Sequence, residues 1–195
     1  MSQLWESVQK NRLAAVALGG NWPSPEGDSA ATLIAALRTI SQEIGPIVSI
    51  SRFFRTPAYP AGAGPDFVNA AALIATGLDA AAVLSGLHRI EARFGRERTE
   101  RWGARTLDLD LVALGDTVLP DPETEARWRK LPAARQRVET PDRLILPHPR
   151  LQDRAFVLIP LAEIAPAWRH PVTGLSVAEM LEALPEADKA AICPI

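Results

Sequence analysis

Hydrophobic residues along this chain follow two periods, one typical of strands and one typical of helices. Four apolar runs have the length and composition of β-strands: residues 13–18, 47–55, 67–76 and 107–114. Between them, residues 33–44 and 83–94 repeat apolar positions at helical spacing, which predicts two amphipathic helices. Each predicted helix follows an aspartate that can cap it, Asp28 or Asp79, and ends at a glycine.

The order of these elements is β-α-β-β-α-β, which is the ferredoxin-like arrangement. We therefore expect an α+β fold in which both helices cover one face of an antiparallel sheet. The opposite face is left for chemistry or for further elements. Two later stretches, 157–164 and 176–184, also have helical spacing and predict C-terminal helical additions to this core. The whole chain, 1–195, is expected to form a single domain.

Two segments fall outside the predicted core. Residues 1–12 are polar and mixed, and they are interpreted as an N-terminal extension. Residues 120–142 are rich in proline, glutamate and arginine and contain few large aliphatic side chains. This composition predicts a solvated, partly helical insertion. A partner-binding role is the alternative, and nothing in the sequence supports it.

Composition narrows the choice of partners and compartment. The formal net charge of −2 weakens a nucleic-acid-binding interpretation. The single cysteine, Cys193, excludes an intramolecular disulfide, and a cytoplasmic location is the simplest expectation. No apolar run approaches the ~18 residues of a membrane span. The N-terminus also lacks the basic and apolar regions of a signal peptide. We expect a monomer that acts on small molecules.

The last predicted strand carries two acids on one face. Residues 107–111 alternate leucine with aspartate, so Asp108 and Asp110 point to the same side. Their Cβ atoms would lie roughly 6.5–7 Å apart, given a rise of about 3.3 Å per residue. Like charges at that distance repel, and a divalent cation such as Mg²⁺ would remove the repulsion. A solvent-exposed strand face is the alternative, and the two acids alone do not decide between them.

A cluster of arginines beside the acids favours the first interpretation. Six of them fall within 17 residues: Arg89, Arg93, Arg96, Arg98, Arg101 and Arg105. Arginine grips phosphate oxygens through two N–H groups at once. Acids that hold a metal, next to arginines that hold oxygens, are suited to a Mg²⁺–polyphosphate ligand.

Other residues suit a flat, hydrogen-bonding ligand. Phe67 and Asn69 are two apart on a predicted strand and share a face, and a buried amide needs partners. An asparagine satisfied by nearby backbone is an equally good reading. Gly19-Gly20 predicts either close approach of the backbone to a ligand or a plain turn. Arg143, His148 and the pair Arg154–Phe156 suggest a second cationic and aromatic wall.

These residues together resemble the 6-hydroxymethyl-7,8-dihydropterin pyrophosphokinase family. The similarity covers residues 13–166 in order and rests on several blocks. The blocks are 17–21, 51–57, 66–71, 101–110, 147–148, 154–156 and 161–166. The family has a ferredoxin-like core and transfers pyrophosphate from ATP to the hydroxymethyl group of the pterin, releasing AMP. It belongs to folate biosynthesis.

The resemblance also implies roles for particular residues. Asp108 and Asp110 would hold two Mg²⁺ ions that bridge the triphosphate of the co-substrate ATP. The pterin would be bound by Thr56, Pro57, Tyr59, Phe67, Asn69 and Phe156. ATP would be contacted by Arg96, Arg98, Arg105, Arg143, His148 and Arg154, with Glu91 on the adenine-side helix. Trp102 would belong to a catalytic loop that closes over the site.

Two other functions remain possible from the residues alone. One is a different Mg²⁺-dependent nucleotide phosphotransferase on the same fold, which would not bind pterin. The other is a non-catalytic ferredoxin-like binding module, which would need neither metal nor paired acids.

Overall fold

The computed structural model describes residues 12–58, 64–95, 105–136 and 138–195. Six strands of this part of the chain form one sheet in the order β5-β1-β4-β3-β6, with β2 also paired to β4. All of its pairings are antiparallel. The strands are β1 (Arg12–Gly20), β2 (Ile47–Ile50), β3 (Phe54–Thr56), β4 (Phe67–Thr76), β5 (Asp108–Leu114) and β6 (Cys193–Pro194).

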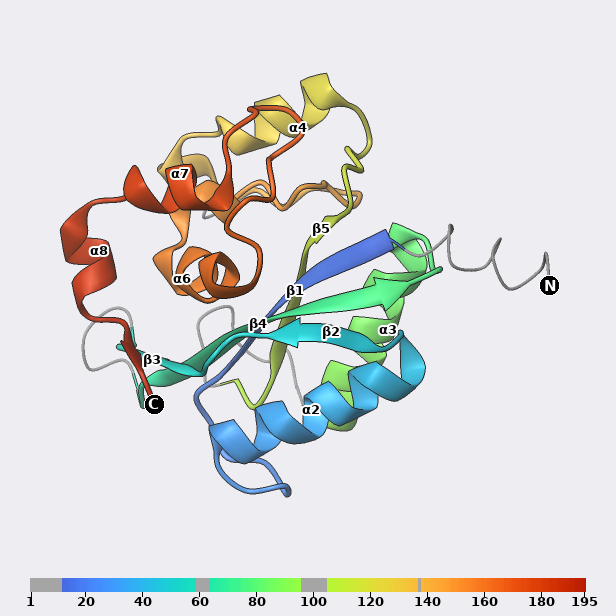
Figure 1. Ribbon diagram of the computed structural model, residues 1–195, viewed down its shortest axis with the longest axis vertical. Helices are drawn as coiled ribbons and strands as arrows, with labels where there is room; N and C mark the ends of the chain where they lie inside the picture. Colours follow the sequence, from blue (N-terminus) through green and yellow to red (C-terminus); the bar gives the residue numbers. More distant parts are fainter. Residues whose placement is uncertain (1–11, 59–63, 96–104, 137) are drawn as a thin grey trace.

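Helices α2 (Ser29–Glu43) and α3 (Ala80–Arg93) cover one face of the sheet, as Figure 1 shows. Their starts are fixed as predicted, because the side chains of Asp28 and Asp79 accept hydrogen bonds from the first-turn N–H groups of Ala31 and Ala82. Their apolar stripes pack on alternate strand residues to form the larger core. Its fully buried members include Val16, Leu33, Ile40, Ile74, Val83, Leu87 and Leu107. The predicted α+β, ferredoxin-like arrangement is confirmed.

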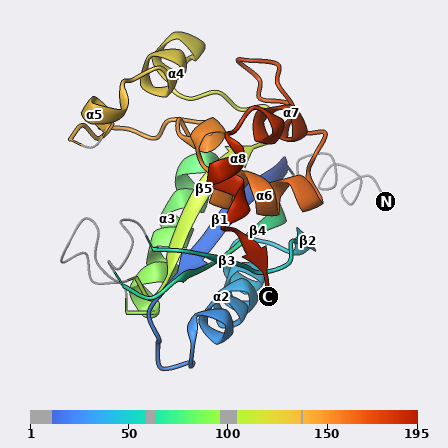
Figure 2. The same ribbon diagram turned by 90° about the vertical axis from the view of Figure 1, so that its left-hand side faces the viewer.

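The opposite face is partly covered by the C-terminal helices, as the two views in Figures 1 and 2 show. Helix α6 (Ala155–Ile164) lies on β4, and α7 (Val177–Glu182) packs on α6. A second, smaller core forms there from residues such as Ala71, Val112, Leu158 and Met180. The remaining helical segments are α4 (Pro122–Arg129), α5 (Ala133–Gln136), η1 (Leu151–Asp153) and α8 (Glu186–Ala190).

The predicted second strand, 47–55, is in fact two strands, β2 and β3. The chain leaves the ladder at Ser51, whose hydroxyl accepts a hydrogen bond from Ala71 N and donates one to Arg52 O. A serine that can bond its neighbouring backbone offers an alternative to regular pairing, so a continuous strand was the wrong prediction. The short β6 was not predicted, and it pairs with β3.

The insertion 120–142 is partly helical as predicted, but it is not uniformly solvated. Glu125 of α4 is fully buried against Arg129 and His170. Composition alone indicated a polar surface, and it could not show that one glutamate has buried partners. In the described residues, no helix combines the length and apolar character needed to cross a membrane.

Candidate active site

One row of residues crosses the three neighbouring strands β5, β1 and β4 on the face opposite α2 and α3. Gly19 of β1 pairs with Asp108 of β5 on one side and with Asn69 of β4 on the other. Adjacent strands lie about 4.8 Å apart, so the backbones that carry Asp108 and Asn69 are separated by roughly 10 Å. The acid and the amide therefore stand at the two ends of one row, with a residue that has no side chain between them.

The glycines that end β1 are required by their neighbours. A Cβ added at Gly19 would lie 2.8 Å from Asn69 Oδ1, and one at Gly20 would lie 2.6 Å from Thr106 O. Both residues belong to the strand, so the plain-turn interpretation is wrong. Next to them, buried Asn21 accepts a hydrogen bond from Arg105 N at 2.9 Å and donates one to Pro65 O at 3.1 Å. Asn21 thus fixes the backbone just before β5.

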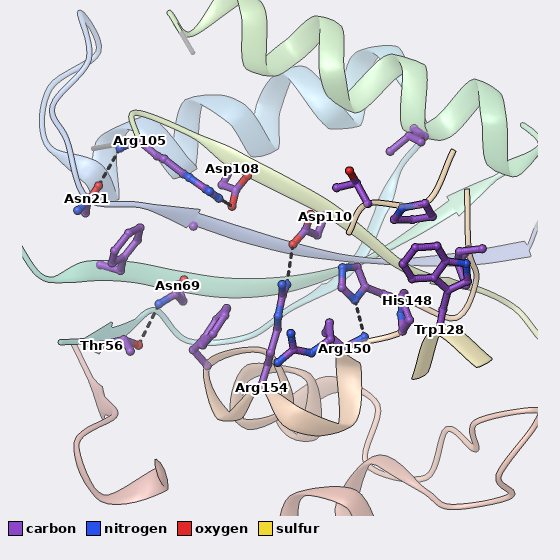
Figure 3. Close-up of a pocket in the computed structure, with 18 of the residues that line it drawn as sticks. Asn21, Thr56, Asn69, Arg105, Asp108, Asp110, Trp128, His148, Arg150 and Arg154 are labelled. Atoms are coloured by element: carbon purple, nitrogen blue, oxygen red, sulfur yellow. Dashed lines mark hydrogen bonds and ion pairs between the residues drawn. The ribbon is translucent and has the colours of Figure 1, made fainter. Parts of the chain in front are cut away.

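Both acids of β5 face a cavity and are paired with arginines (Figure 3). Asp108 Oδ2 forms an ion pair with Arg105 Nη1. Asp110 Oδ2 accepts a hydrogen bond from Arg154 Nη1 at 3.2 Å. Their side chains are 22% and 38% exposed, so each carboxylate remains reachable from the cavity. The two acids lie on the same face of β5, as the strand period predicted.

Glu91, predicted as a nucleotide contact, is not among the residues that line this cavity. It is 2% exposed, and its Oε1 accepts a hydrogen bond from Leu109 N at 2.7 Å. Leu109 stands between the two acids on β5. Glu91 therefore positions the strand that carries them, so its carboxylate is not the nucleotide contact that the resemblance implied.

The cavity has a volume of about 940 Å³, near the upper end for small-molecule sites and large enough for two small ligands. Its first end is lined by Phe67, Asn69, Phe156, Thr56 and Pro57. Asn69 is 6% exposed and donates from Nδ2 to Thr56 Oγ1 at 2.9 Å. Two aromatic rings and a held amide form a place for a flat, polar heterocycle.

The centre of the cavity is charged. Besides the acids, it is lined by Arg105, Arg150, Arg154 and His148. His148 Nδ1 accepts a hydrogen bond from Arg150 N at 3.0 Å, which leaves the proton of the neutral ring on Nε2. Burial and the nearby Arg154 lower the pKa of His148 to about 4, so it is neutral at pH 7. The guanidinium of Arg154 also lies 5.7 Å from the centre of the Phe156 ring.

The far end of the cavity is built from other segments. Leu84 of α3, Trp128 of α4, Leu131, Leu144 and Arg143 also line the cavity. Arg143 is exposed and pairs with Asp142 at 3.3 Å. In Figure 3, Trp128 lies beyond His148, at the end away from Thr56 and Asn69.

The structure thus brings most of the predicted site residues to one cavity. Four of them, Tyr59, Arg96, Arg98 and Trp102, lie outside the described residues. Among the lining residues that sequence reasoning missed are Asn21, Trp128 and Arg150. The position of Arg150, two residues after His148, was a usable signal in the sequence. Trp128 stood in a segment interpreted as solvated, where an aromatic residue was itself the signal.

The fold and this cavity define an α+β protein with a two-ended, charge-lined pocket on its sheet. A sequence model of the family 7,8-dihydro-6-hydroxymethylpterin-pyrophosphokinase (HPPK) matches residues 15–166. The chain belongs to this family.

Individual relatives agree with that assignment. The chain is 36% identical over 182 residues to a Synechocystis protein named 2-amino-4-hydroxy-6-hydroxymethyldihydropteridine pyrophosphokinase, covering 93% of this chain and 80% of the relative. A Pseudomonas aeruginosa protein of the same name is 35% identical, with 87% and 90% covered.

Solved structures show the same fold. A Plasmodium falciparum HPPK-DHPS chain crystallised with pterin and p-hydroxybenzoate superposes with a TM-score of 0.69 at 13% identity. The match covers 95% of this chain and 47% of that one, so this chain spans about half the length of the HPPK-DHPS protein.

Proposed function

We propose that this protein transfers the pyrophosphoryl group of ATP to the hydroxymethyl group of 6-hydroxymethyl-7,8-dihydropterin, in folate biosynthesis. The products are AMP and the pterin diphosphate. The observation that carries the proposal is the row Asp108–Gly19–Asn69. It places an acid and an amide that can bind a heterocycle on the same face of the sheet. The names of the relatives described above support the same reaction.

The first end of the cavity is the proposed pterin subsite. Phe67 and Phe156 supply aromatic faces, and Asn69 supplies donors and an acceptor for the polar edge of the ring. A ring that lacks matching groups would leave the buried amide unpaired, which is a strong basis for discrimination. The hydrogen bond from Asn69 to Thr56 fixes the direction of the amide before any ligand arrives.

The donor set at the centre fits Mg²⁺. Asp108 and Asp110 offer two carboxylates on one strand face, and we propose that they hold two ions. Within the described residues, no group of three or more His, Cys, Asp or Glu side chains is arranged to hold a metal ion. Such a sparse set suits Mg²⁺, which takes its other ligands from phosphate and water. The bound metal would neutralise charge on the phosphates.

The proposed reaction is an in-line displacement at the β-phosphorus. The hydroxymethyl oxygen forms the new O–P bond and loses its proton, while the bond to the α-phosphate oxygen breaks and AMP leaves. Arg105, Arg150 and Arg154 surround this position and stabilise the negative charge of the phosphates. His148, neutral at pH 7, contributes an N–H donor through Nε2 rather than a charge. Most of the catalysis is then alignment and charge neutralisation.

The direct test is the identity of the nucleotide product. Purified protein with ATP, Mg²⁺ and hydroxymethyl-dihydropterin should yield AMP in a one-to-one ratio with pterin diphosphate. The control reaction omits the pterin and should yield neither. Formation of ADP, or turnover that does not depend on the pterin, would contradict the proposal.

A further inference from the structure

We propose that Trp128 of α4 is the stacking wall of the nucleotide base and gives the site a preference for purine nucleotides. This inference rests on the proposed function, because it takes the phosphates of ATP to occupy the charged centre. It assigns a specificity-determining role to a residue of the segment 120–142, which sequence composition had assigned to solvent.

The layout of the cavity places the base at Trp128. The first end, at Asn69 and Thr56, suits the pterin, and Asp110, Arg154 and His148 hold the centre. A nucleotide whose phosphates lie at the centre must extend its base toward the remaining end. Figure 3 shows Trp128 there, beyond His148.

The chemistry of that end suits a flat base. Leu84, Leu131 and Leu144 line the cavity together with the indole of Trp128, and they supply apolar surface beside the charged centre. Trp128 is half-buried, which leaves part of its ring available to a ligand. Nucleic-acid bases stack well on aromatic side chains, and the larger purines offer more area for stacking than pyrimidines do.

The helix that carries Trp128 is anchored from its other side. Glu125, one turn earlier, is fully buried, and its Oε1 bonds Arg129 Nε at 3.1 Å. The same oxygen lies 3.5 Å from Nε2 of buried His170. His170 Nδ1 accepts a hydrogen bond from Val172 N, so the proton of the neutral ring is on Nε2, the nitrogen that lies near Glu125.

This buried cluster ties α4 to the segment that precedes α7. Its members would lose their partners if α4 moved, and unpaired buried charges are costly. The helix that carries the indole is therefore held in place before a nucleotide binds, and a preorganised wall loses little conformational freedom on binding.

The test compares base-bearing and base-free ligands. Wild type, Trp128→Leu and Trp128→Phe are titrated calorimetrically with Mg²⁺ and α,β-methylene-ATP, in which the bond that would break is replaced by a stable one. Trp128→Leu should bind about tenfold more weakly, and Trp128→Phe should recover most of the loss. With α,β-methylene-CTP the loss should be smaller, so the purine preference shrinks. Mg²⁺–tripolyphosphate, which has no base, should bind all three proteins equally.

Arg127→Ala provides a matched control, because Arg127 is an exposed residue of the same helix that does not line the cavity. It should bind every ligand as the wild type does. Unchanged affinity of Trp128→Leu for α,β-methylene-ATP would overturn the inference. So would an equal loss for tripolyphosphate, which would mean that α4 had moved. Pterin binding and AMP release by the wild type test the proposed function separately.

Discussion

The two ends of the cavity are built in different ways. At the first end and the centre, Asn69 and the acids Asp108 and Asp110 stand on two strands that both pair with β1, and the register of the sheet fixes their spacing. At the far end, Trp128 stands on a short helix that is held by one buried charge cluster around Glu125. The sheet end is supported by many backbone hydrogen bonds. The helix end depends on a few side chains, so single substitutions should shift it more easily.

The largest effect should come from the acids at the centre. Asp108→Ala and Asp110→Ala should each lower turnover by roughly 10²–10⁴-fold, because each removes a carboxylate from the proposed Mg²⁺ site. Steady-state AMP formation measures the loss. Circular dichroism and thermal unfolding should show an intact fold, since both side chains are partly exposed. Near-normal turnover in both variants would refute their proposed metal role.

The sheet end was largely predictable from sequence, because its signals are periodic. The bounds of β4, the caps Asp28 and Asp79, and the shared face of the two acids all follow from spacing and local hydrogen bonding. The break at Ser51 was not predictable, because it depends on a bond to Ala71 in another strand.

The far end was not predictable for a similar reason. The aromatic side chain of Trp128 stood out in a polar segment, but its place in the cavity depends on the tertiary packing of α4, which no local pattern encodes. Glu91 was expected to contact the nucleotide from the adenine-side helix, but its carboxylate accepts a hydrogen bond from the backbone of β5.

The buried cluster of Glu125, Arg129 and His170, which anchors α4, should make the free energy of unfolding depend on pH. Burial, with a contribution from Arg129, lowers the pKa of His170 to about 4. Between pH 6.5 and 4 the unfolded chain takes up a proton at this histidine and the folded chain does not, so stability falls as pH falls. A shift of this size corresponds to at most about 3 kcal/mol. The contribution is fully present above pH 6.5.

Glu125 has the opposite effect on the pH dependence of stability. Burial raises the pKa of Glu125, so this group costs stability as pH rises above its usual range. His170→Gln isolates the histidine, because glutamine keeps an N–H donor and does not titrate. As the pH is lowered from 7 to 4.5, the urea midpoint of unfolding should fall more steeply in the wild type than in His170→Gln. His148 is present in both proteins, so its own lowered pKa cancels in the comparison. Equal slopes would show that His170 is not held neutral by burial.

A smaller effect is expected where the sheet end is most closely packed. In Gly19→Ala, the new methyl group would meet Asn69 Oδ1 at 2.8 Å, and the amide must turn away. Pterin affinity should fall by about tenfold, which corresponds to about 1.4 kcal/mol. Affinity for α,β-methylene-ATP should stay within twofold of the wild type.

A double-mutant cycle tests the stated cause. In an Asn69→Ala background there is no amide to displace, so Gly19→Ala should have little further effect on pterin binding. A tenfold loss in both backgrounds would mean that the methyl group distorts β1 itself. The sheet end would then be as easily disturbed as the helix end.

The smallest effect should come from Arg143, at the rim of the far end. It is exposed and already paired with Asp142, so solvent and salt screen its charge. Arg143→Ala should raise KM for ATP by only about two- to threefold, and the difference should shrink in high salt. Arg154→Ala is the matched comparison, because that guanidinium is partly buried between Asp110 and Phe156 and should matter far more. If Arg143→Ala were as damaging as Arg154→Ala, the far end would bind the phosphates, and Trp128 could not be the wall of the base.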